Sequence, residues 1–155
     1  MKSPLVIGCG AEGRGDDVAG LLVARRLRAL GVEAIEHRGD ALALLESWNE
    51  AGAEREVVLV DAVVTGAPVG TVTVWDARSV PVLGDFFRCS THAFGVAEAV
   101  ELARRLDRLP PRMRIYGIEG ERFGRGQEPS QPVLEAVERV VWDLASSVVC
   151  GAADG

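Results

Sequence analysis

Two acidic side chains and one imidazole fall at positions where a parallel sheet would bring them together. Asp17 follows the first predicted strand, Asp61 ends the central predicted strand, and His92 opens a later predicted helix. In open α/β sheets, ligand sites gather outside the carboxyl ends of the strands. Two carboxylates and one imidazole suit nickel, zinc or manganese, and three ligands leave coordination positions open for a reaction. The sequence therefore predicts a metal-facing site made of these three residues.

Each of the three residues also has an ordinary structural interpretation. Asp17 is one position beyond the predicted helix cap and could simply complement the helix dipole. Asp61 could cap a turn, but it follows four apolar residues, and a buried, unpaired carboxylate is costly, which favours a functional role. His92 could form a local hydrogen bond, although the dipole at a helix start keeps an imidazole neutral and able to bind a metal.

The elements expected to position these residues alternate between strands and helices. Strands are predicted at residues 5–7, 32–36, 57–60, 71–75 and 114–118. Helices are predicted from Asp16 to just before Gly31, and over residues 41–48, 93–106 and 131–149. This alternation predicts a three-layer αβα sandwich with a mostly parallel, twisted sheet of about five strands. The short link between residues 57–60 and 71–75 predicts that these two strands are neighbours.

Composition narrows the class of protein. We expect a single domain over residues 1–150 and a disordered tail over residues 151–155. We interpret the three tryptophans, Trp48, Trp75 and Trp142, as packing residues. The formal net charge of −6 gives no basic footprint for nucleic acid or anionic lipid. Three cysteines cannot all pair internally, and neither a signal peptide nor a membrane span is recognised. We therefore expect a cytoplasmic monomer without nucleic-acid or membrane partners.

The glycine-rich loop after the first strand supports three interpretations. Gly8–Gly13 formally satisfies GxGxxG, which would indicate a Rossmann-like module that binds a nucleotide. Against this, Asp16 and Asp17 would repel a pyrophosphate at the start of the helix. The loop could instead permit a tight turn with Asp16 as the helix cap, or it could present a carboxylate site. Cys9 could reach the same edge, although a small buried thiol is its usual role.

Several sequence blocks together resemble the hydrogenase maturation proteases, which trim the C-terminal extension of the nickel–iron hydrogenase large subunit. The resemblance spans nearly the whole chain. The matching blocks are Gly8-Cys9-Gly10, Asp16-Asp17-Val18-Ala19-Gly20, Val58-Leu59-Val60-Asp61-Ala62, Pro68-Val69-Gly70-Thr71-Val72, Ser90-Thr91-His92, Tyr116-Gly117-Ile118-Glu119 and Ser130-Gln131-Pro132-Val133.

The resemblance implies specific roles for three residues. It implies that Asp17, Asp61 and His92 form the catalytic and metal-recognising set of an aspartyl-type endopeptidase. It also implies that the nickel belongs to the substrate, a hydrogenase large-subunit precursor, so that no tightly bound intrinsic metal is expected. Two positions depart from the family pattern, because Ala11 stands where Asn is usual and Gly13 where an apolar residue is usual. These departures leave open a non-catalytic relative that binds a metalloprotein without cutting it.

Overall fold

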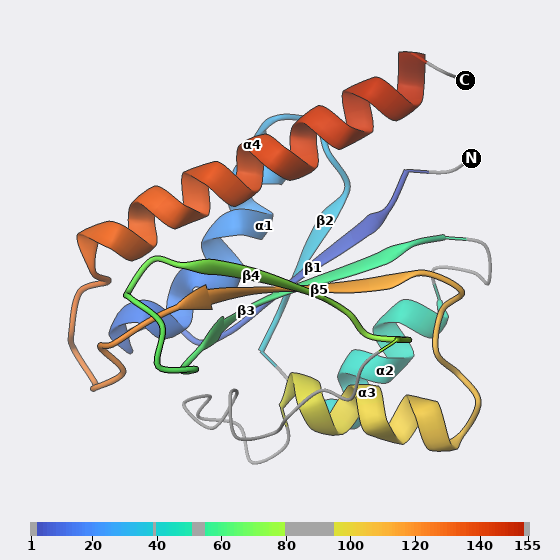
Figure 1. Ribbon diagram of the computed structural model, residues 1–155, viewed down its shortest axis with the longest axis horizontal. Coiled ribbons are helices and arrows are strands. Elements are labelled where there is room, and N and C mark those ends of the chain that lie inside the picture. Colours follow the sequence, from blue (N-terminus) through green and yellow to red (C-terminus); the bar gives the residue numbers. More distant parts are fainter. Residues whose placement is uncertain (1–2, 39, 51–54, 80–94, 154–155) are drawn as a thin grey trace.

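A five-stranded sheet lies between two pairs of helices, in a computed structural model that describes residues 3–38, 40–50, 55–79 and 95–153, the last six by their backbone alone (Figure 1). The order across the sheet is β2-β1-β3-β5-β4. All pairings are parallel except that of β4 with β5. The strands are β1 (Leu5–Cys9), β2 (Ala34–His37), β3 (Val57–Val63), β4 (Val72–Asp76) and β5 (Met113–Glu119). The predicted αβα sandwich is confirmed.

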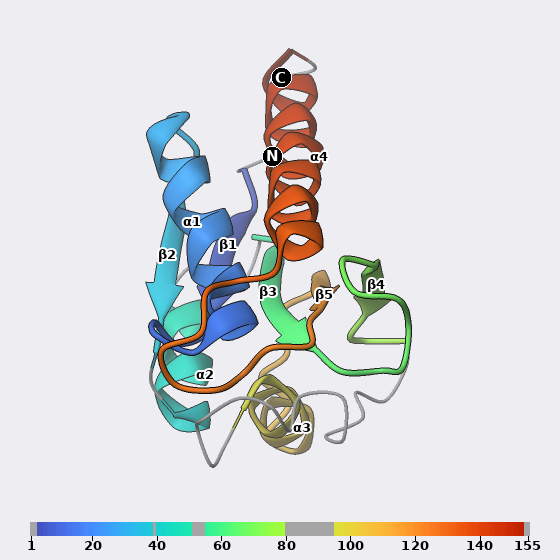
Figure 2. The same cartoon turned by 90° about the vertical axis from the view of Figure 1, so that its left-hand side faces the viewer.

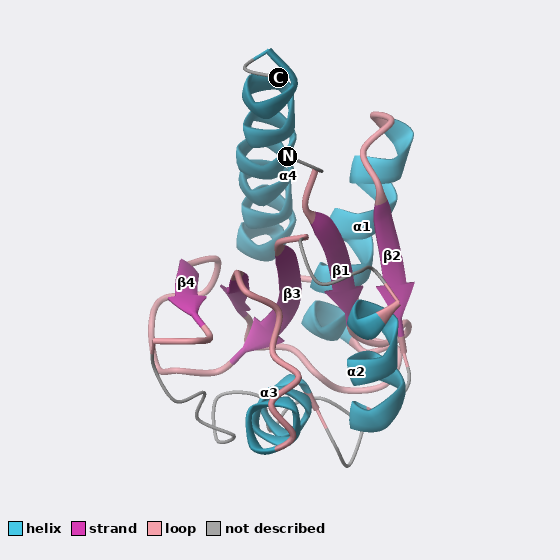
Figure 3. Ribbon diagram, turned by 90° about the vertical axis from the view of Figure 1, so that its right-hand side faces the viewer, coloured by secondary structure: helices cyan, strands magenta, loops and turns pink. Residues whose placement is uncertain are grey.

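The helices cover both faces of the sheet, as Figures 2 and 3 show from opposite sides. The helical elements are a 3-10 turn η1 (Gly15–Val18), α1 (Ala19–Ala29), α2 (Ala41–Asn49), α3 (Val96–Arg105) and α4 (Gln131–Ala153). Alternate residues of β1 and β3 pack against α2 and α3 on one face, and the intervening residues pack against α1 and α4 on the other. Strands buried on both faces read as continuous apolar runs, which explains their clear sequence signal.

The predicted pairing of the fourth strand with the central strand is wrong. β5 lies between β3 and β4, so β4 forms the antiparallel edge of the sheet. β3 is buried at every position, whereas β4 is only partly buried. A strand that is apolar on both faces is suited to the interior of the sheet, and a partly exposed antiparallel strand is suited to its edge.

Several element boundaries also differ from the predictions. α3 begins at Val96 rather than at residue 93, because extended Gly95 caps it and donates its N–H to the Glu98 carboxylate at 2.9 Å. α4 continues past residue 149 to Ala153 and so includes the first three residues predicted as a tail. Trp48 is buried as predicted, but Trp142 is 76% exposed, so its predicted packing role is wrong.

Within the residues that the structure describes, no helix combines the length and the apolar character needed to cross a bilayer.

Candidate functional site

Asp17 and Asp61 lie together at the carboxyl ends of the central strands. Both are almost fully buried, with 1% and 2% of their surfaces exposed. Asp61 does not end its strand as predicted: it pairs in register with Gly117, and β3 continues to Val63. Burial raises the pKa of Asp61 well above its usual range, and the charge of Asp17 raises it further. The N–H of Ala62 donates a hydrogen bond to Asp61 Oδ1 at 2.9 Å, which partly opposes this rise. The site therefore holds two carboxyl groups that disfavour simultaneous ionisation.

Two glycines allow α1 to approach the sheet closely enough to form this pair. A Cβ atom on Gly20 would overlap the carbonyl oxygens of Cys9 and Val60, and a Cβ atom on Gly8 would overlap the carbonyl oxygen of Gly20. Only glycine permits this backbone contact. The turn that carries Asp17 is consequently held over the ends of β1 and β3.

Among the described residues, Cys9 is a third titratable group beside the pair. Its side chain is buried, and burial raises the pKa of its thiol, which the charges of Asp61 and Asp17 raise further. A thiol in this environment remains protonated and is a poor nucleophile. In the ranges that the structure describes, no cluster of three or more His, Cys, Asp or Glu residues could hold a metal ion. The described residues therefore offer a carboxylate pair rather than a complete metal site.

Asp16 has a different role from its neighbour Asp17. It is fully buried, and its Oδ2 accepts hydrogen bonds from the N–H groups of Glu121 at 2.8 Å and Arg122 at 2.9 Å. Ser130 donates its hydroxyl to Oδ2 at 2.8 Å and its N–H to Oδ1 at 2.6 Å. Burial alone would raise the pKa of Asp16, but these hydrogen bonds outweigh it and lower the pKa. Asp16 is an ionised clamp on a distant segment, and its predicted role as a helix cap is wrong.

Glu119, another buried acid, anchors a different turn at the same end of the sheet. Its carboxylate accepts the Thr65 hydroxyl at 2.6 Å, the Thr65 N–H at 2.9 Å and the Gly66 N–H at 3.3 Å. Sequence reasoning did not assign it a role. The available signal was an acid that ends an apolar strand, the same signal that drew attention to Asp61.

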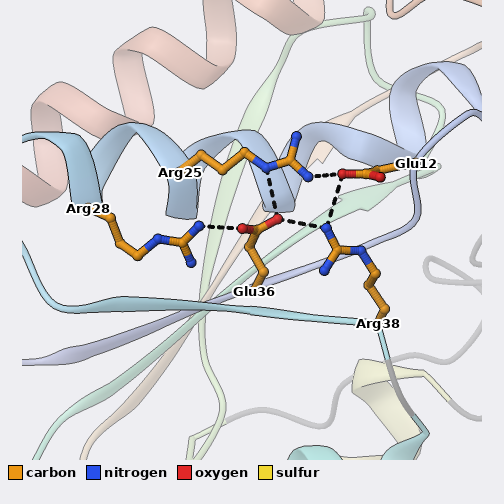
Figure 4. Close-up of polar contacts among 5 residues, drawn as sticks. All are labelled: Glu12, Arg25, Arg28, Glu36 and Arg38. Atoms are coloured by element: carbon orange, nitrogen blue, oxygen red, sulfur yellow. Dashed lines mark hydrogen bonds and ion pairs between the residues drawn. The ribbon is translucent and has the colours of Figure 1, made fainter.

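An arginine–glutamate cluster made of Glu12, Arg25, Arg28, Glu36 and Arg38 joins the glycine-rich loop, α1 and the end of β2 (Figure 4). All three arginines bind Glu36, and two of them also bind Glu12. Burial would raise the pKa of Glu36, but hydrogen bonds from Arg28 and Arg25 outweigh it and lower the pKa to about 2. The cluster ties the glycine-rich loop, through Glu12, to α1 and to the end of β2.

Comparison with known proteins identifies the family. A family model described as hydrogenase maturation protease matches residues 27–147. The chain belongs to the hydrogenase maturation protease family. None of the curated proteins matches it.

Solved structures of hydrogenase maturation proteases share its fold. HycI from Thermococcus kodakarensis KOD1 is 25% identical with a TM-score of 0.72, and the match covers 93% of this chain and 90% of that one. HycI from Escherichia coli is 22% identical with a TM-score of 0.73, covering 92% and 89%. HybD from Escherichia coli is 20% identical with a TM-score of 0.69, covering 94% of each chain. This maturation protease is thus an endopeptidase by family.

The glycine loop of this maturation protease does not suit a nucleotide. The N–H of Gly10 donates to the carbonyl of His37 at 3.3 Å, and that of Ala11 donates to the carbonyl of Asp17 at 3.1 Å. These amides are therefore occupied instead of being available to a pyrophosphate. Asp16 and Asp17 add buried carboxyl groups where the phosphate would lie.

The structure tests the predicted site of this maturation protease only in part. It brings Asp17 and Asp61 together and places Cys9 beside them. His92 lies outside the described residues. Asp16 and Glu119 are two further buried acids at this end of the sheet, and both accept hydrogen bonds from backbone N–H groups.

Proposed function

We propose that this protein removes the C-terminal extension of a nickel–iron hydrogenase large-subunit precursor after nickel has been inserted. The observation that supports the proposal most directly is the buried carboxylate pair of Asp17 and Asp61, at the carboxyl ends of the strands in a maturation-protease fold. Burial raises the pKa of Asp61 and repulsion by Asp17 raises it further; this repulsion falls when a cation lies between the two carboxyl groups. A metal carried by the substrate therefore fits this pair well.

In this proposal Asp17, Asp61 and His92 bind the nickel of the precursor and so position the peptide bond to be cut. The role of His92 rests on its motif, Ser90-Thr91-His92, and on its place four residues before the start of α3. Hydrolysis can then proceed through polarisation of the carbonyl by the metal or through water activated by a carboxylate. Both routes make cleavage depend on the loaded metal.

Cleavage of loaded and unloaded precursor tests the proposal. Purified protein is incubated with nickel-loaded and nickel-free precursor, and the products are identified by gel electrophoresis and mass spectrometry. We expect cleavage of the loaded precursor only, and its loss in Asp17→Asn, Asp61→Asn and His92→Ala. His37→Ala is the matched control, since His37 is the only other histidine in the sequence. Equal cleavage of both precursors, or unchanged cleavage by the three variants, would contradict the proposal.

A further inference from the structure

Asp16 and Asp17 are adjacent in the sequence but interact with different parts of the protein. Asp17 interacts with Asp61 and Cys9 at the ends of the strands. Asp16 directs both carboxylate oxygens to the connection between β5 and α4, residues 120–130, here called the 120–130 segment. Four hydrogen bonds occupy its carboxylate, so Asp16 has little capacity left for a ligand.

Backbone contacts reinforce the attachment of the 120–130 segment to η1. The Asp16 N–H donates to the Arg122 carbonyl at 2.7 Å, which makes the bonding between these two residues reciprocal. The Gly15 N–H donates to the Gln127 carbonyl at 3.0 Å, and the Gly126 N–H donates to the Gly13 carbonyl at 2.8 Å. Figure 2 shows the connection before α4 passing beside the turn that precedes α1. The 120–130 segment is therefore the outer support of η1.

Most of the 120–130 segment is exposed to solvent. Its residues 121–128 are exposed apart from the partly buried Phe123, and three of its positions are glycine. Glycine-rich, exposed backbone has a large conformational entropy to lose on ordering. The four hydrogen bonds that the buried Asp16 carboxylate accepts from this segment oppose this loss.

We propose that Asp16 is a positioning residue: by clamping the 120–130 segment onto η1, it fixes Asp17 opposite Asp61 before the precursor binds. The role in cleavage rests on the proposed function, whereas the clamp itself does not. The support beside Asp17 is thus preformed in the free protein rather than assembled by the substrate. A displacement of a reacting group by about 1 Å can lower a rate by about 100-fold, so a loosened η1 matters for turnover.

Limited trypsin digestion tests the clamp without any substrate. Arg122 and Arg125 are exposed trypsin sites within the 120–130 segment. The Asp16→Asn variant keeps one acceptor oxygen but replaces the other with an NH₂ group. This NH₂ group would face N–H or O–H groups of the segment that also donate. We expect cleavage after Arg122 and Arg125 to be about 10-fold faster in Asp16→Asn, and faster still in Asp16→Ala, at a temperature where circular dichroism shows folded protein. Ser130→Ala, which removes only the hydroxyl donor, should give a smaller acceleration. Glu128→Gln alters an exposed side chain of the segment and is the matched control.

Kinetics with nickel-loaded precursor separate positioning from overall stability. We expect kcat per folded molecule to fall about 10- to 100-fold in Asp16→Asn, with little change in KM. Asp17→Asn should abolish turnover without accelerating trypsin cleavage after Arg122 or Arg125. Parental trypsin rates in Asp16→Asn would overturn the clamp, and parental kcat with accelerated digestion would overturn the positioning role. If the parent cleaves no precursor, the proposed function fails, and trypsin digestion still decides whether the clamp exists.

Discussion

Asp61 and Asp17 come from different elements, β3 and η1, yet they interact: burial raises the pKa of Asp61, and the charge of Asp17 raises it further. Because both acids are almost fully buried, their carboxylates repel each other in the free protein. The mutual repulsion of the two carboxyl groups costs folding stability, which is common at functional sites. Stability and function are therefore expected to trade against each other at this pair.

Asp61→Asn should make the protein more stable at neutral pH. The pKa of Asp61 is raised in the folded state, so its favourable contribution is complete below the ordinary value of 3.8 and is lost as pH rises toward the folded-state pKa. Removing the ionisable group should thus raise the free energy of unfolding by about 1–3 kcal/mol at pH 7, with the gain shrinking toward pH 4.

Urea denaturation across this pH range measures the effect. Asp107→Asn is the control, because Asp107 is exposed and its left-handed backbone, with φ of 56°, tolerates Asn. A less stable Asp61→Asn at pH 7 would show that the buried carboxylate is compensated in the folded state.

Glu36→Gln should reduce stability in a pH-dependent way. The pKa of Glu36 is lowered from 4.5 to about 2, so its contribution is present above pH 4.5 and is lost as pH falls toward 2. Since the partner arginines are more exposed than Glu36, we expect a loss of about 1–2 kcal/mol at pH 7, reduced in high salt. Thermal denaturation from pH 2 to pH 7 should show the two proteins converging at low pH, and a constant difference would contradict the prediction.

Glu119→Gln should release the turn at Thr65 and Gly66. The variant retains one acceptor oxygen but turns an amide donor toward groups that themselves donate, so we expect a loss of about 1–3 kcal/mol in the free energy of unfolding. Hydrogen exchange at the amides of Thr65 and Gly66 should accelerate. Thr65→Val, which removes only the hydroxyl, should cost about 1 kcal/mol, and unchanged exchange in Glu119→Gln would refute the anchoring role.

Gly20→Ala should damage both stability and activity. Its Cβ would overlap the carbonyl oxygens of Cys9 and Val60, so α1 must move away from the sheet and carry Asp17 with it. We expect a loss of about 2–4 kcal/mol and strongly reduced cleavage of loaded precursor. Gly31→Ala is the matched control beyond the other end of α1: it has φ of +82° but no atom within 4 Å of an added Cβ, so about 1 kcal/mol is expected with activity retained.

The sequence predicts structure best in the strands that are buried on both faces of the sheet. The apolar runs of β1 and β3 predict buried strands, and Asp61 stands out because its carboxylate interrupts one of these runs. Their parallel arrangement then placed Asp17 near Asp61, and the structure confirms that these two come together. These inferences needed only local pattern and the rule that parallel strands end at one edge.

Long-range contacts explain what the sequence could not predict. The partners of Asp16 at Glu121 and Ser130 lie 105 and 114 positions further along the chain, so nothing local distinguished its role from that of Asp17. The place of β4 depended likewise on β5, which is encoded after α3.

The insertion of β5 between β3 and β4 also has a consequence for how the chain folds. Among the described strands, β4 hydrogen-bonds only with β5, which begins at Met113. During synthesis, β3 and β4 emerge long before β5. Until then, the edges of β3 and β4 that pair with β5 lack their backbone hydrogen-bond partners. Non-local pairing of this kind slows folding and exposes strand edges to aggregation. The sheet is therefore complete only after β5, which ends in Glu119, has been synthesised. The end of the sheet that carries the candidate site consequently forms late.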